Sequence, residues 1–474
     1  MARQMSLRLT NTLTGRQEPF VPLEPGHVRM YSCGPTVYAP AHVGNFRSFL
    51  FADLLRRYLG WQGLSVTWVM NITDVDDKII RDARREGVGI AELTERYTAA
   101  FLDDARRLRM TPPDVMPRAT RHIPDMVALI ERLLESGHAY RTDDGSIFFR
   151  IASWPGYGRL ARLDPTQQRV GERVESDEYD KDDVRDFAVW KGPKEGEPSW
   201  DTSIGPGRPG WHIECSAMSM RYLGASFDIH TGGVDLVFPH HEDEIAQSEA
   251  ATGLQFVQTW LHCAHLQMGG EKMAKRTGNI ERPADVYARG FSPRALRYAL
   301  IAAQYRAPLE FGDDSLRAAS SAVDRLATAL AALDAYRSDA PDEPALPALL
   351  ADTRARFEAA LDDDLNVSPA LAAVFDLVRE LNRRIDTRAL STADAGSAAT
   401  FLRDLDRVLG VMEEEPEVLE PELAAMLDER ASARARRDWA TSDRLRDELA
   451  DRGVLIEDTR DGQRWRRAVE ARRG

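Results

Sequence analysis

The sequence predicts an α/β protein with a split, Rossmann-type parallel sheet and an insertion, followed by an α-helical bundle and a small C-terminal α+β tail. Three observations support this prediction. Strand-like and helix-like segments alternate in the N-terminal part, an acidic Gly/Pro-rich stretch interrupts them, and helical spacing dominates from about residue 315. Alternating strands and helices favour a parallel, doubly wound sheet.

The first half of the predicted sheet lies before residue 90. Residues 27–33 form an apolar, strand-like run, and a Pro-containing loop leads to an amphipathic helical segment at 46–61. A β-branched run at 64–74 predicts the second strand, and residues 74–87 predict the second helix. Together these segments make one strand–helix–strand–helix unit.

An insertion is predicted next. A helical segment at 122–137 precedes a hairpin that turns at Asp144 and Gly145. The stretch 172–210 is acidic, rich in Gly and Pro, and weakly periodic. We therefore expect residues 119–205 to separate the two halves of the sheet.

The sheet is expected to resume after this insertion. Strands are predicted at 210–218 and 226–238, a helix at 239–252, and a further strand at 256–270. The last strand leads into a basic loop flanked by glycines.

The C-terminal third is predicted to be helical. Ser368 followed by Pro369 is a strong helix-start signal, with the serine as N-cap. Residues 433–453 are predicted to form one amphipathic helix, and a small hairpin is expected to turn at Asp461 and Gly462.

Composition limits the function classes. The net charge of −14 argues against a broad surface that coats nucleic acid, although the last 44 residues carry 12 Arg against 9 Asp and Glu. Three cysteines, Cys33, Cys215 and Cys263, form no paired framework, so a reducing, cytoplasmic location is expected. The N-terminus lacks a signal-peptide core and no stretch of eighteen apolar residues occurs, so no membrane association is expected.

Two motifs predict a phosphate-binding site. His42 and Asn45 lie three residues apart at the end of a loop after a predicted strand, where free N–H groups and the helix dipole favour anions. Lys272 and Lys275 are two of only six lysines in the chain, and they share the Gly-flanked loop. No Walker A run is present, so the two motifs are predicted to bind opposite sides of one triphosphate.

Potential metal ligands occur in three separate segments of the predicted sheet region. Cys33 follows the first predicted strand, Cys215 follows the insertion, and His240 and Glu244 share one helical face. Two thiolates, an imidazole and a carboxylate make a plausible Zn²⁺ shell. The alternative is that both cysteines are small, buried core residues; Cys263 is interpreted as such a residue.

These motifs resemble those of known enzymes. H-x-G-N at 42–45 and K-M-A-K-R at 272–276 resemble the two signatures of class I aminoacyl-tRNA synthetases. In order along the chain, YSCGPTVY, NITDVDDKII, GWHIECSAM, FPHHEDEIAQSEA and EKMAKRTGN resemble the blocks of the cysteinyl-tRNA synthetase family, and the C-terminal segment is similar to that family's anticodon-binding segment. The resemblance covers nearly the whole chain.

The resemblance implies the activity and its partners. The substrates would be L-cysteine, ATP with magnesium, and tRNA(Cys), and one zinc ion per chain would select the thiol over the hydroxyl of serine. A monomer is expected. The implied segments are a first catalytic half at 1–118, a connective insertion at 119–205, a second catalytic half at 206–268, a signature loop and stem-contact region at 269–314, a tRNA-binding helical bundle at 315–420 and an anticodon-binding segment at 421–474.

The resemblance also assigns residues to roles. His42 and Asn45 would contact the ATP phosphates, and Lys272 and Lys275 would stabilise charge on the α-phosphate and the leaving pyrophosphate. The remaining assignments are Gly232 and Asp235 to ATP; Thr36, Trp211 and His230 to the amino acid; Cys33, Cys215, His240 and Glu244 to zinc; and Arg464, Trp465, Arg466 and Arg467 to tRNA. His241 is the nearest rival ligand. Ala274 and Arg276 replace two serines of the family signature, so hydroxyl contacts to phosphate are absent there.

Three alternatives remain open at this point. A cysteine ligase of the mycothiol type would use the same adenylation core but would need no tRNA-binding tail. An inactive, tRNA-binding paralogue would not need His42, Asn45, Lys272 and Lys275. A zinc hydrolase using His240 and its neighbours would leave the basic loop unexplained, and no HExxH run is present.

Overall fold

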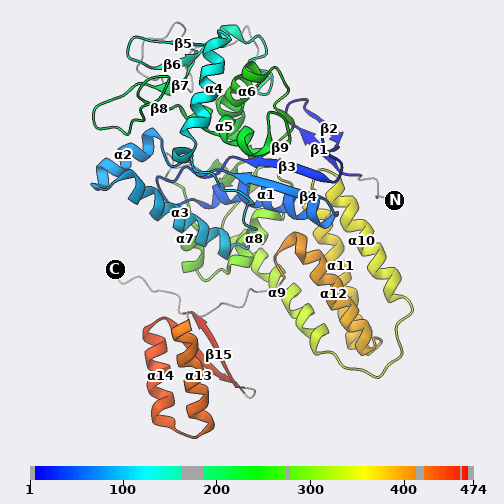
Figure 1. The fold of residues 1–474 in the computed structure, drawn as a ribbon. Helices are drawn as coiled ribbons and strands as arrows, with labels where there is room; N and C mark the ends of the chain where they lie inside the picture. Colours follow the sequence, from blue (N-terminus) through cyan, green and yellow to red (C-terminus); the bar gives the residue numbers. More distant parts are fainter. Residues whose placement is uncertain (1–5, 163–184, 274–277, 413–420, 460–461, 468–474) are drawn as a thin grey trace.

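The computed structural model describes residues 6–162, 185–273, 278–412, 421–459 and 462–467. Its centre is a four-stranded parallel sheet with the strand order β10-β9-β3-β4 (Figure 1). The strands span β3 (His27–Ser32), β4 (Ser65–Met70), β9 (Phe227–Gly233) and β10 (Val257–Cys263). Two strands precede the insertion and two follow it, which confirms the predicted split sheet.

The two faces of this sheet contribute to different cores, because successive strand residues point to opposite faces. Met30 and Trp68 are paired across β3 and β4 and join the large core that includes α1 (Val43–Trp61). Tyr31 and Val69 point the other way and join a smaller core with Cys215 and Ile245, which lie on α5 (Trp211–Leu223) and α6 (Glu242–Thr252).

The insertion forms its own small sheet, with order β5-β6-β7-β8 and antiparallel pairing. The predicted hairpin at Asp144 and Gly145 connects its first two strands. The helix predicted at 122–137 is α4 (Ile123–Glu135). The elements of the small sheet are β5 (Ala139–Arg141), β6 (Ile147–Phe149), β7 (Phe187–Lys191) and β8 (Arg208–Pro209).

One predicted strand is a helix. Residues 210–218, expected to resume the sheet, form the start of α5, which begins after Gly210. The segment is buried on nearly every side, from Ile213 to Ser219. A continuous buried run has no amphipathic period, so periodicity could not distinguish helix from strand.

The first half of the chain contains two further helices. They are α2 (Asp77–Glu86) and α3 (Ile90–Arg107). A two-stranded hairpin, β1 (Arg8–Asn11) and β2 (Arg16–Pro19), was not expected from the sequence; its Thr12 backbone N–H donates to Trp260 O at 2.8 Å, which ties it to β10.

A second small sheet carries the basic loop. Its order is β12-β11-β13, formed by β12 (Glu271–Lys272), β11 (Leu266–Met268) and β13 (Leu309–Glu310). The helices α7 (Pro283–Ala288) and α8 (Pro293–Ile301) lie between β12 and β13 in the sequence. The chain then enters the predicted helical region.

Four long helices form that region: α9 (Asp313–Ala335), α10 (Leu346–Asp362), α11 (Val367–Asp386) and α12 (Thr392–Leu409). The predicted N-cap at Ser368 is wrong, because α11 begins at Val367 with Asn366 in the N-cap position. Ser368 lies in the first turn, where its hydroxyl donates to Ala302 O at 2.7 Å and ties the bundle to α8.

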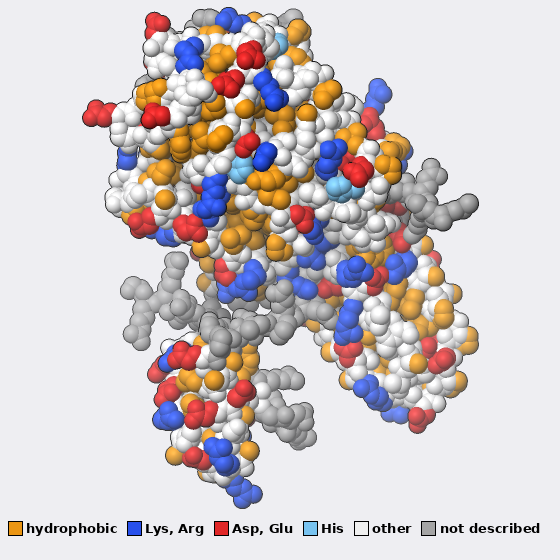
Figure 2. Space-filling view, in the orientation of Figure 1, with side chains coloured by type: hydrophobic (Ala, Val, Ile, Leu, Met, Phe, Trp, Pro, Cys, Tyr) orange, Lys and Arg blue, Asp and Glu red, His pale blue; other side chains and the backbone are white. Residues whose placement is uncertain are grey.

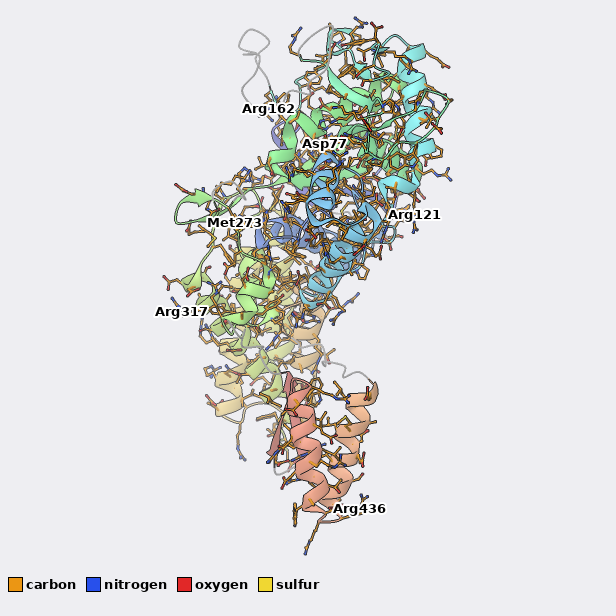
Figure 3. The ribbon with its side chains drawn as sticks, turned by 90° about the vertical axis from the view of Figure 1, so that its left-hand side faces the viewer. Asp77, Arg121, Arg162, Met273, Arg317 and Arg436 are labelled. Carbon is orange, nitrogen blue, oxygen red and sulfur yellow. The ribbon has the colours of Figure 1, made fainter. Side chains whose placement is uncertain are left out.

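The C-terminal unit contains two helices where one was expected. They are α13 (Pro421–Ala435) and α14 (Trp439–Asp451), followed by the antiparallel pair β14 (Val454–Thr459) and β15 (Gly462–Arg467). The break arises at Arg437, whose φ of 62° is left-handed, and at Asp438, whose side chain accepts the Thr441 N–H. In Figure 3 Arg436 marks the end of this unit that lies farthest from the insertion.

A buried ionic network joins α1 to α8 and, through α8, to α12. Arg297 Nη2 and Arg57 Nε both donate to Asp53 Oδ2, at 2.7 and 2.9 Å, and Asp53 and Arg297 are fully buried. Arg297 Nε also donates to Leu409 O at 2.7 Å. Burial acts to raise the pKa of Asp53, but Arg297 and Arg57 outweigh it and hold that pKa below its usual value.

We expect Asp53→Asn to lower the free energy of unfolding by about 3–5 kcal/mol, because it leaves Arg297 buried without a counter-charge. The lowered pKa means that Asp53 stabilises the fold above its unfolded pKa of about 4, and that this contribution disappears as pH falls through the folded value. Urea unfolding near pH 7 measures the loss. Asp376→Asn, which removes an exposed partner of Arg356, is the matched control; equal effects of both changes would contradict the prediction.

None of the helices in the described ranges combines the length and apolar character needed to cross a bilayer.

Candidate functional site

A pocket of about 410 Å³ opens where the carboxyl ends of the four parallel strands meet. Side chains from both sides of the insertion line it. Ten sequence-predicted site residues are among them: Cys33, Thr36, His42, Asn45, Trp211, Cys215, Gly232, Asp235, His240 and Lys272. The edge at which parallel strands end is the usual position for a ligand site in this architecture.

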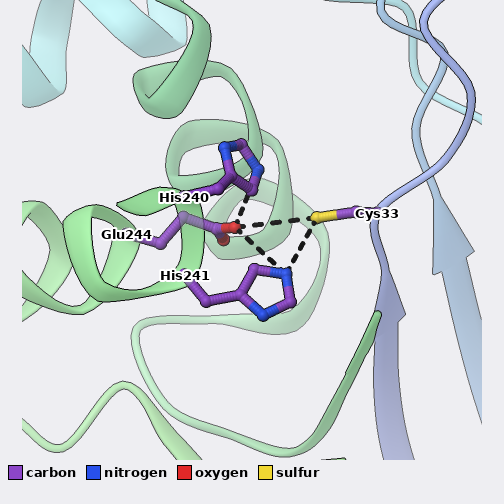
Figure 4. Close-up of side chains that lie close together, drawn as sticks. All are labelled: Cys33, His240, His241 and Glu244. Carbon is purple, nitrogen blue, oxygen red and sulfur yellow. Dashed lines mark hydrogen bonds and ion pairs between the residues drawn. The ribbon is translucent and has the colours of Figure 1, made fainter. Parts of the chain in front are cut away.

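The potential metal ligands converge at one side of this pocket (Figure 4). Cys33 Sγ lies 3.7 Å from Cys215 Sγ, 3.6 Å from Glu244 Oε1 and 3.4 Å from His241 Nε2. His240 Nε2 lies 3.1 Å from Glu244 Oε1. The four predicted ligands therefore lie together, and His241 joins them as a fifth donor.

The local fold explains this convergence. Cys33 directly follows β3, and Cys215 lies in the second turn of α5. His240 and His241 immediately precede α6, whose first turn contains Glu244. Three segments, widely separated in the sequence, thus place their donors at the same end of the sheet.

The charges of the cluster suit a cation. Cys215 forms a hydrogen bond with Cys33, and this bond lowers the pKa of Cys215 to about 6, although burial acts to raise it. Burial acts to raise the pKa of Glu244, but His230 and His240 lower it to about 2. Burial acts to lower the pKa of His240, yet Cys215 and Glu244 raise it to about 10, so His240 holds a proton that offsets one of the two negative charges. A divalent cation would replace that proton, because a ligating imidazole is neutral.

The donor set fits zinc in chemistry and in size. Bonds of about 2.0–2.3 Å in a tetrahedron place neighbouring ligand atoms roughly 3.3–3.8 Å apart. The contacts of Cys33 with Cys215, His241 and Glu244 span 3.4–3.7 Å, and the His240–Glu244 contact is 3.1 Å. Sulfur, imidazole and carboxylate donors are the ones that Zn²⁺ takes.

Buried groups outside the cluster contact the ring nitrogen of His240 that faces away from Glu244. His240 Nδ1 lies 2.8 Å from His212 Nδ1, and His212 Nε2 lies 3.3 Å from Asp243 Oδ2. The hydroxyl of Tyr157, which belongs to the insertion, donates to Asp243 Oδ1 at 2.5 Å. Such outer contacts orient metal ligands, so the insertion supports the cluster.

A second chain of contacts holds His241. Its Nδ1 lies 2.7 Å from His262 Nε2, and His262 Nδ1 lies 2.7 Å from Thr12 Oγ1. The Nε2 atom of His241 therefore faces Cys33. His230 is fully buried with its Nε2 3.0 Å from Glu244 Oε2, so it contacts the cluster rather than the pocket.

The phosphate motifs occupy the other side of the pocket. His42 caps α1: its Nδ1 accepts the Asn45 N–H at 3.3 Å, and Asn45 Oδ1 accepts the His42 N–H at 3.1 Å. Lys272 Nζ lies 3.7 Å from Asp235 Oδ2, which brings two predicted nucleotide residues face to face. A side chain at Gly232 would lie 2.6 Å from His241, so the pocket wall requires glycine there. Lys275, Ala274 and Arg276 lie outside the described residues.

The sequence analysis missed Asn71. This buried residue follows β4; its Oδ1 accepts the Gly34 N–H at 2.8 Å, and its Nδ2 donates to Thr73 Oγ1 at 3.1 Å. Its Oδ1 also lies 3.8 Å from Cys215 Sγ. Asn71 thus fixes the backbone next to Cys33, and the only sequence signal was a polar residue at the end of a buried strand.

The predicted nucleic-acid residues lie in β15, in the C-terminal unit. Trp465, which the resemblance assigns to tRNA, is partly buried against the small core of Leu423, Leu449 and Val454, because it pairs with Ile456 across the two strands. For Arg464, Arg466 and Arg467 the structure describes only the backbone.

The aromatic side chain exposed in this unit is instead Trp439, at 55%. The Arg434 guanidinium lies 5.8 Å from its ring. On the face drawn in Figure 2, acidic and basic side chains alternate over the unit. Trp439 and its neighbouring arginine were missed because the sequence analysis concentrated on the arginines around Trp465.

Comparisons with known proteins agree with this architecture. Residues 19–321 match the family model of tRNA synthetases class I (C) catalytic domain, residues 356–413 match the DALR domain, and residues 417–466 match the cysteinyl-tRNA ligase anticodon binding domain. Among solved structures, methionyl-tRNA synthetase of Mycobacterium tuberculosis is similar with a TM-score of 0.56 at 16% identity, over 81% of this chain and 90% of that one. A LeuRS–tRNA complex of Agrobacterium radiobacter gives 0.59 at 13% identity, over 82% and 85%. These likenesses show the fold.

Relatives with much higher identity cover the whole length. Cysteine–tRNA ligase of Solibacter usitatus is 47% identical over 470 residues, which cover 98% of this chain and all of that protein. Cysteine–tRNA ligase of Symbiobacterium thermophilum is 46% identical over 474 residues, with the same coverage. Together with the anticodon-binding match, these relatives show that the chain belongs to the cysteine–tRNA ligase family of class I synthetases.

Proposed function

We propose that this chain activates L-cysteine with ATP to cysteinyl-adenylate and transfers the cysteine to the 3′ end of tRNA(Cys). The observation that carries the proposal is that a cluster of thiol, imidazole and carboxylate donors shares one pocket with His42, Asn45 and Lys272. An amino acid held by its sulfur at the first group and a triphosphate held at the second would meet between them.

Selection of cysteine is assigned to Cys33, Cys215, His240 and Glu244, which would hold one zinc ion. When bound, zinc supplies a Lewis acid that prefers a thiolate to a hydroxyl. The Trp211 ring stacks on His240 with centroids 4.2 Å apart and remains 36% exposed at the pocket, so it can cover the bound amino acid. Thr36, which also lines the pocket, is assigned to the amino acid, and His230 acts on it through Glu244.

Activation is assigned to the phosphate motifs. The cap at the start of α1 holds His42 and Asn45 where the helix dipole favours an anion. Lys272 would stabilise charge on the α-phosphate and the pyrophosphate, and Lys275 is assigned the same role from its sequence motif. Gly232 and Asp235 would face the rest of the nucleotide. No covalent nucleophile is required, since the carboxylate of cysteine attacks in line and the site supplies position and charge.

Recognition of tRNA is assigned to the parts after residue 314, with the segment 421–474 at the anticodon. The match of residues 417–466 to an anticodon binding domain favours this over a cysteine ligase of the mycothiol type, which has no use for such a unit. Trp439 beside Arg434 is the exposed platform on which an unpaired base would stack.

A pyrophosphate exchange assay tests the proposed function. Purified protein with ATP, labelled pyrophosphate and cysteine is expected to form labelled ATP, and serine is expected to support a kcat/KM at least about 10³-fold lower, because it cannot replace a thiolate ligand. Absence of cysteine-dependent exchange in zinc-replete protein would support an inactive paralogue. Exchange without any charging of tRNA(Cys) would support the mycothiol type.

A further inference from the structure

Arg47 is a buried charge to which the mechanism above gives no role. It lies on α1, two residues after Asn45, and only 2% of it is exposed. In the described part of the chain no carboxylate lies within ion-pair distance of its guanidinium, and Cys263 is its neighbour. Burying an arginine without an acidic partner is costly unless its N–H groups are satisfied otherwise.

Two backbone carbonyls accept hydrogen bonds from this side chain, while its buried Nε has no hydrogen-bond partner among the described residues. Arg47 Nη1 donates to His265 O at 2.9 Å, and Nη2 donates to Ala307 O at 2.6 Å. His265 directly precedes β11, and Ala307 lies two residues before β13. The guanidinium therefore bridges the starts of two parallel strands in the small sheet β12-β11-β13.

That sheet positions Lys272. Gln267 of β11 pairs with Lys272 of β12, and Gln267 O accepts the Phe311 N–H at 2.8 Å just after β13. The next residue, Met273, is 4% exposed, belongs to the same core as Val43, and is labelled in Figure 3. The register of β11 therefore fixes where the lysine backbone lies.

The helix that carries Arg47 positions the other phosphate motif, because α1 begins directly after His42. One side chain thus links the helix of the first motif to the sheet of the second. Arginine suits this link because its planar fork can donate to two carbonyls at once, whereas a lysine ammonium at the end of its stem is a single point.

We propose that Arg47 is a positioning residue for ATP activation, which sets the spacing between the His42–Asn45 cap and the sheet that holds Lys272. This inference rests on the proposed function. The cysteine-binding side of the pocket is built from β3, β4, α5 and α6 and makes no hydrogen bond with Arg47 in the described residues. Replacing Arg47 should therefore impair the use of ATP and leave cysteine binding unchanged.

Arg47→Lys is the test, measured by pyrophosphate exchange with each substrate varied in turn. The expected result is a kcat/KM for ATP about 10- to 100-fold lower, since misplacement of a catalytic group by about 1 Å has effects of that size. The KM for cysteine should stay within about twofold of wild type. The matched control is Arg57→Lys on the same helix: Arg57 also donates to carbonyls, Arg407 O at 3.0 Å and Arg109 O at 2.6 Å, but neither belongs to the sheet that holds Lys272.

The other outcomes decide between the inference and the proposed function. If wild type shows no cysteine-dependent exchange, the proposed function fails first. If wild type is active, three results for Arg47→Lys would overturn the positioning role. The kinetic constants for ATP could be unchanged, those for ATP and cysteine could change equally, or the variant could behave like Arg57→Lys. Arg47→Met, which keeps the length without the donors, should be at least as impaired toward ATP; if neither variant folds, Arg47 serves stability alone and the inference is wrong.

Discussion

Replacing Cys215 with serine is expected to remove at least nine-tenths of the bound zinc and to lower cysteine-dependent exchange at least about 100-fold. A hydroxyl is a poor zinc ligand, and even changes to groups behind the ligands weaken metal binding about 10- to 100-fold. Cys215 also carries one of the two negative charges that the cluster offers, and its loss leaves Cys33, whose pKa burial raises well above the usual thiol value. Elemental analysis after dialysis and the exchange assay measure the two effects.

The chain provides a matched control for this change. Cys263 is equally buried, but it lies at the end of β10 beside Arg47 and outside the ligand cluster. Cys263→Ser should therefore keep about one zinc per chain. If Cys215→Ser also keeps its zinc, the ligand set is Cys33, His240, His241 and Glu244, the alternative group whose donor atoms all lie within 4.8 Å of one another.

A chain that ends at Met412 is expected to activate cysteine at the wild-type rate but to charge tRNA(Cys) about 100-fold less efficiently. The removed unit has a hydrophobic core of its own, made of Leu423, Leu449 and Val454. Loss of the unit should leave the pocket intact, since none of the unit's described residues lines it. Stacking on one base is worth about 1–3 kcal/mol, so loss of a few contacts reaches this size.

The comparison of exchange with aminoacylation in the same preparation measures this separation. Trp439→Ala in the full-length chain is the finer variant; we expect the KM for tRNA to rise about tenfold while exchange stays unchanged. Trp465→Ala is its counterpart in the small core and should lower the thermal stability of the unit. A parallel fall of exchange and charging in the shortened chain would show that the C-terminal unit supports the catalytic fold.

The fold was predictable where strand-like and helix-like segments alternate along the sequence. The strands β3, β4, β9 and β10 are short strand-like runs followed by loops or helices, and their alternation with helices already indicated a parallel sheet. The segment of α5 could not be assigned, because burial on all sides removes the pattern that separates helix from strand. The break at Arg437 was hidden for a different reason: a left-handed arginine leaves no mark in the hydrophobic spacing.

The site was predictable where a residue type by itself suggests a chemical role, such as metal binding. Cys33, Cys215, His240 and Glu244 stand out as metal-ligand types, and family resemblance selected them from other candidates. Their neighbours could not be found in this way. Arg47 looks like any arginine of an amphipathic helix until its two carbonyl partners, more than 200 residues away, are known. The same holds for Asn71 and Asp243, whose importance lies only in what they contact.

The topology of the central sheet has a consequence for biosynthesis. β3 can pair with β4 once both have left the ribosome, but its other edge pairs with β9, where Met30 meets Ile229. At about 5–20 residues per second, the intervening polypeptide takes roughly 10–40 s to be made. Throughout that interval one edge of β3 has no strand to pair with, and the thiol of Cys33 lacks Cys215, His241 and Glu244, which have not yet been translated.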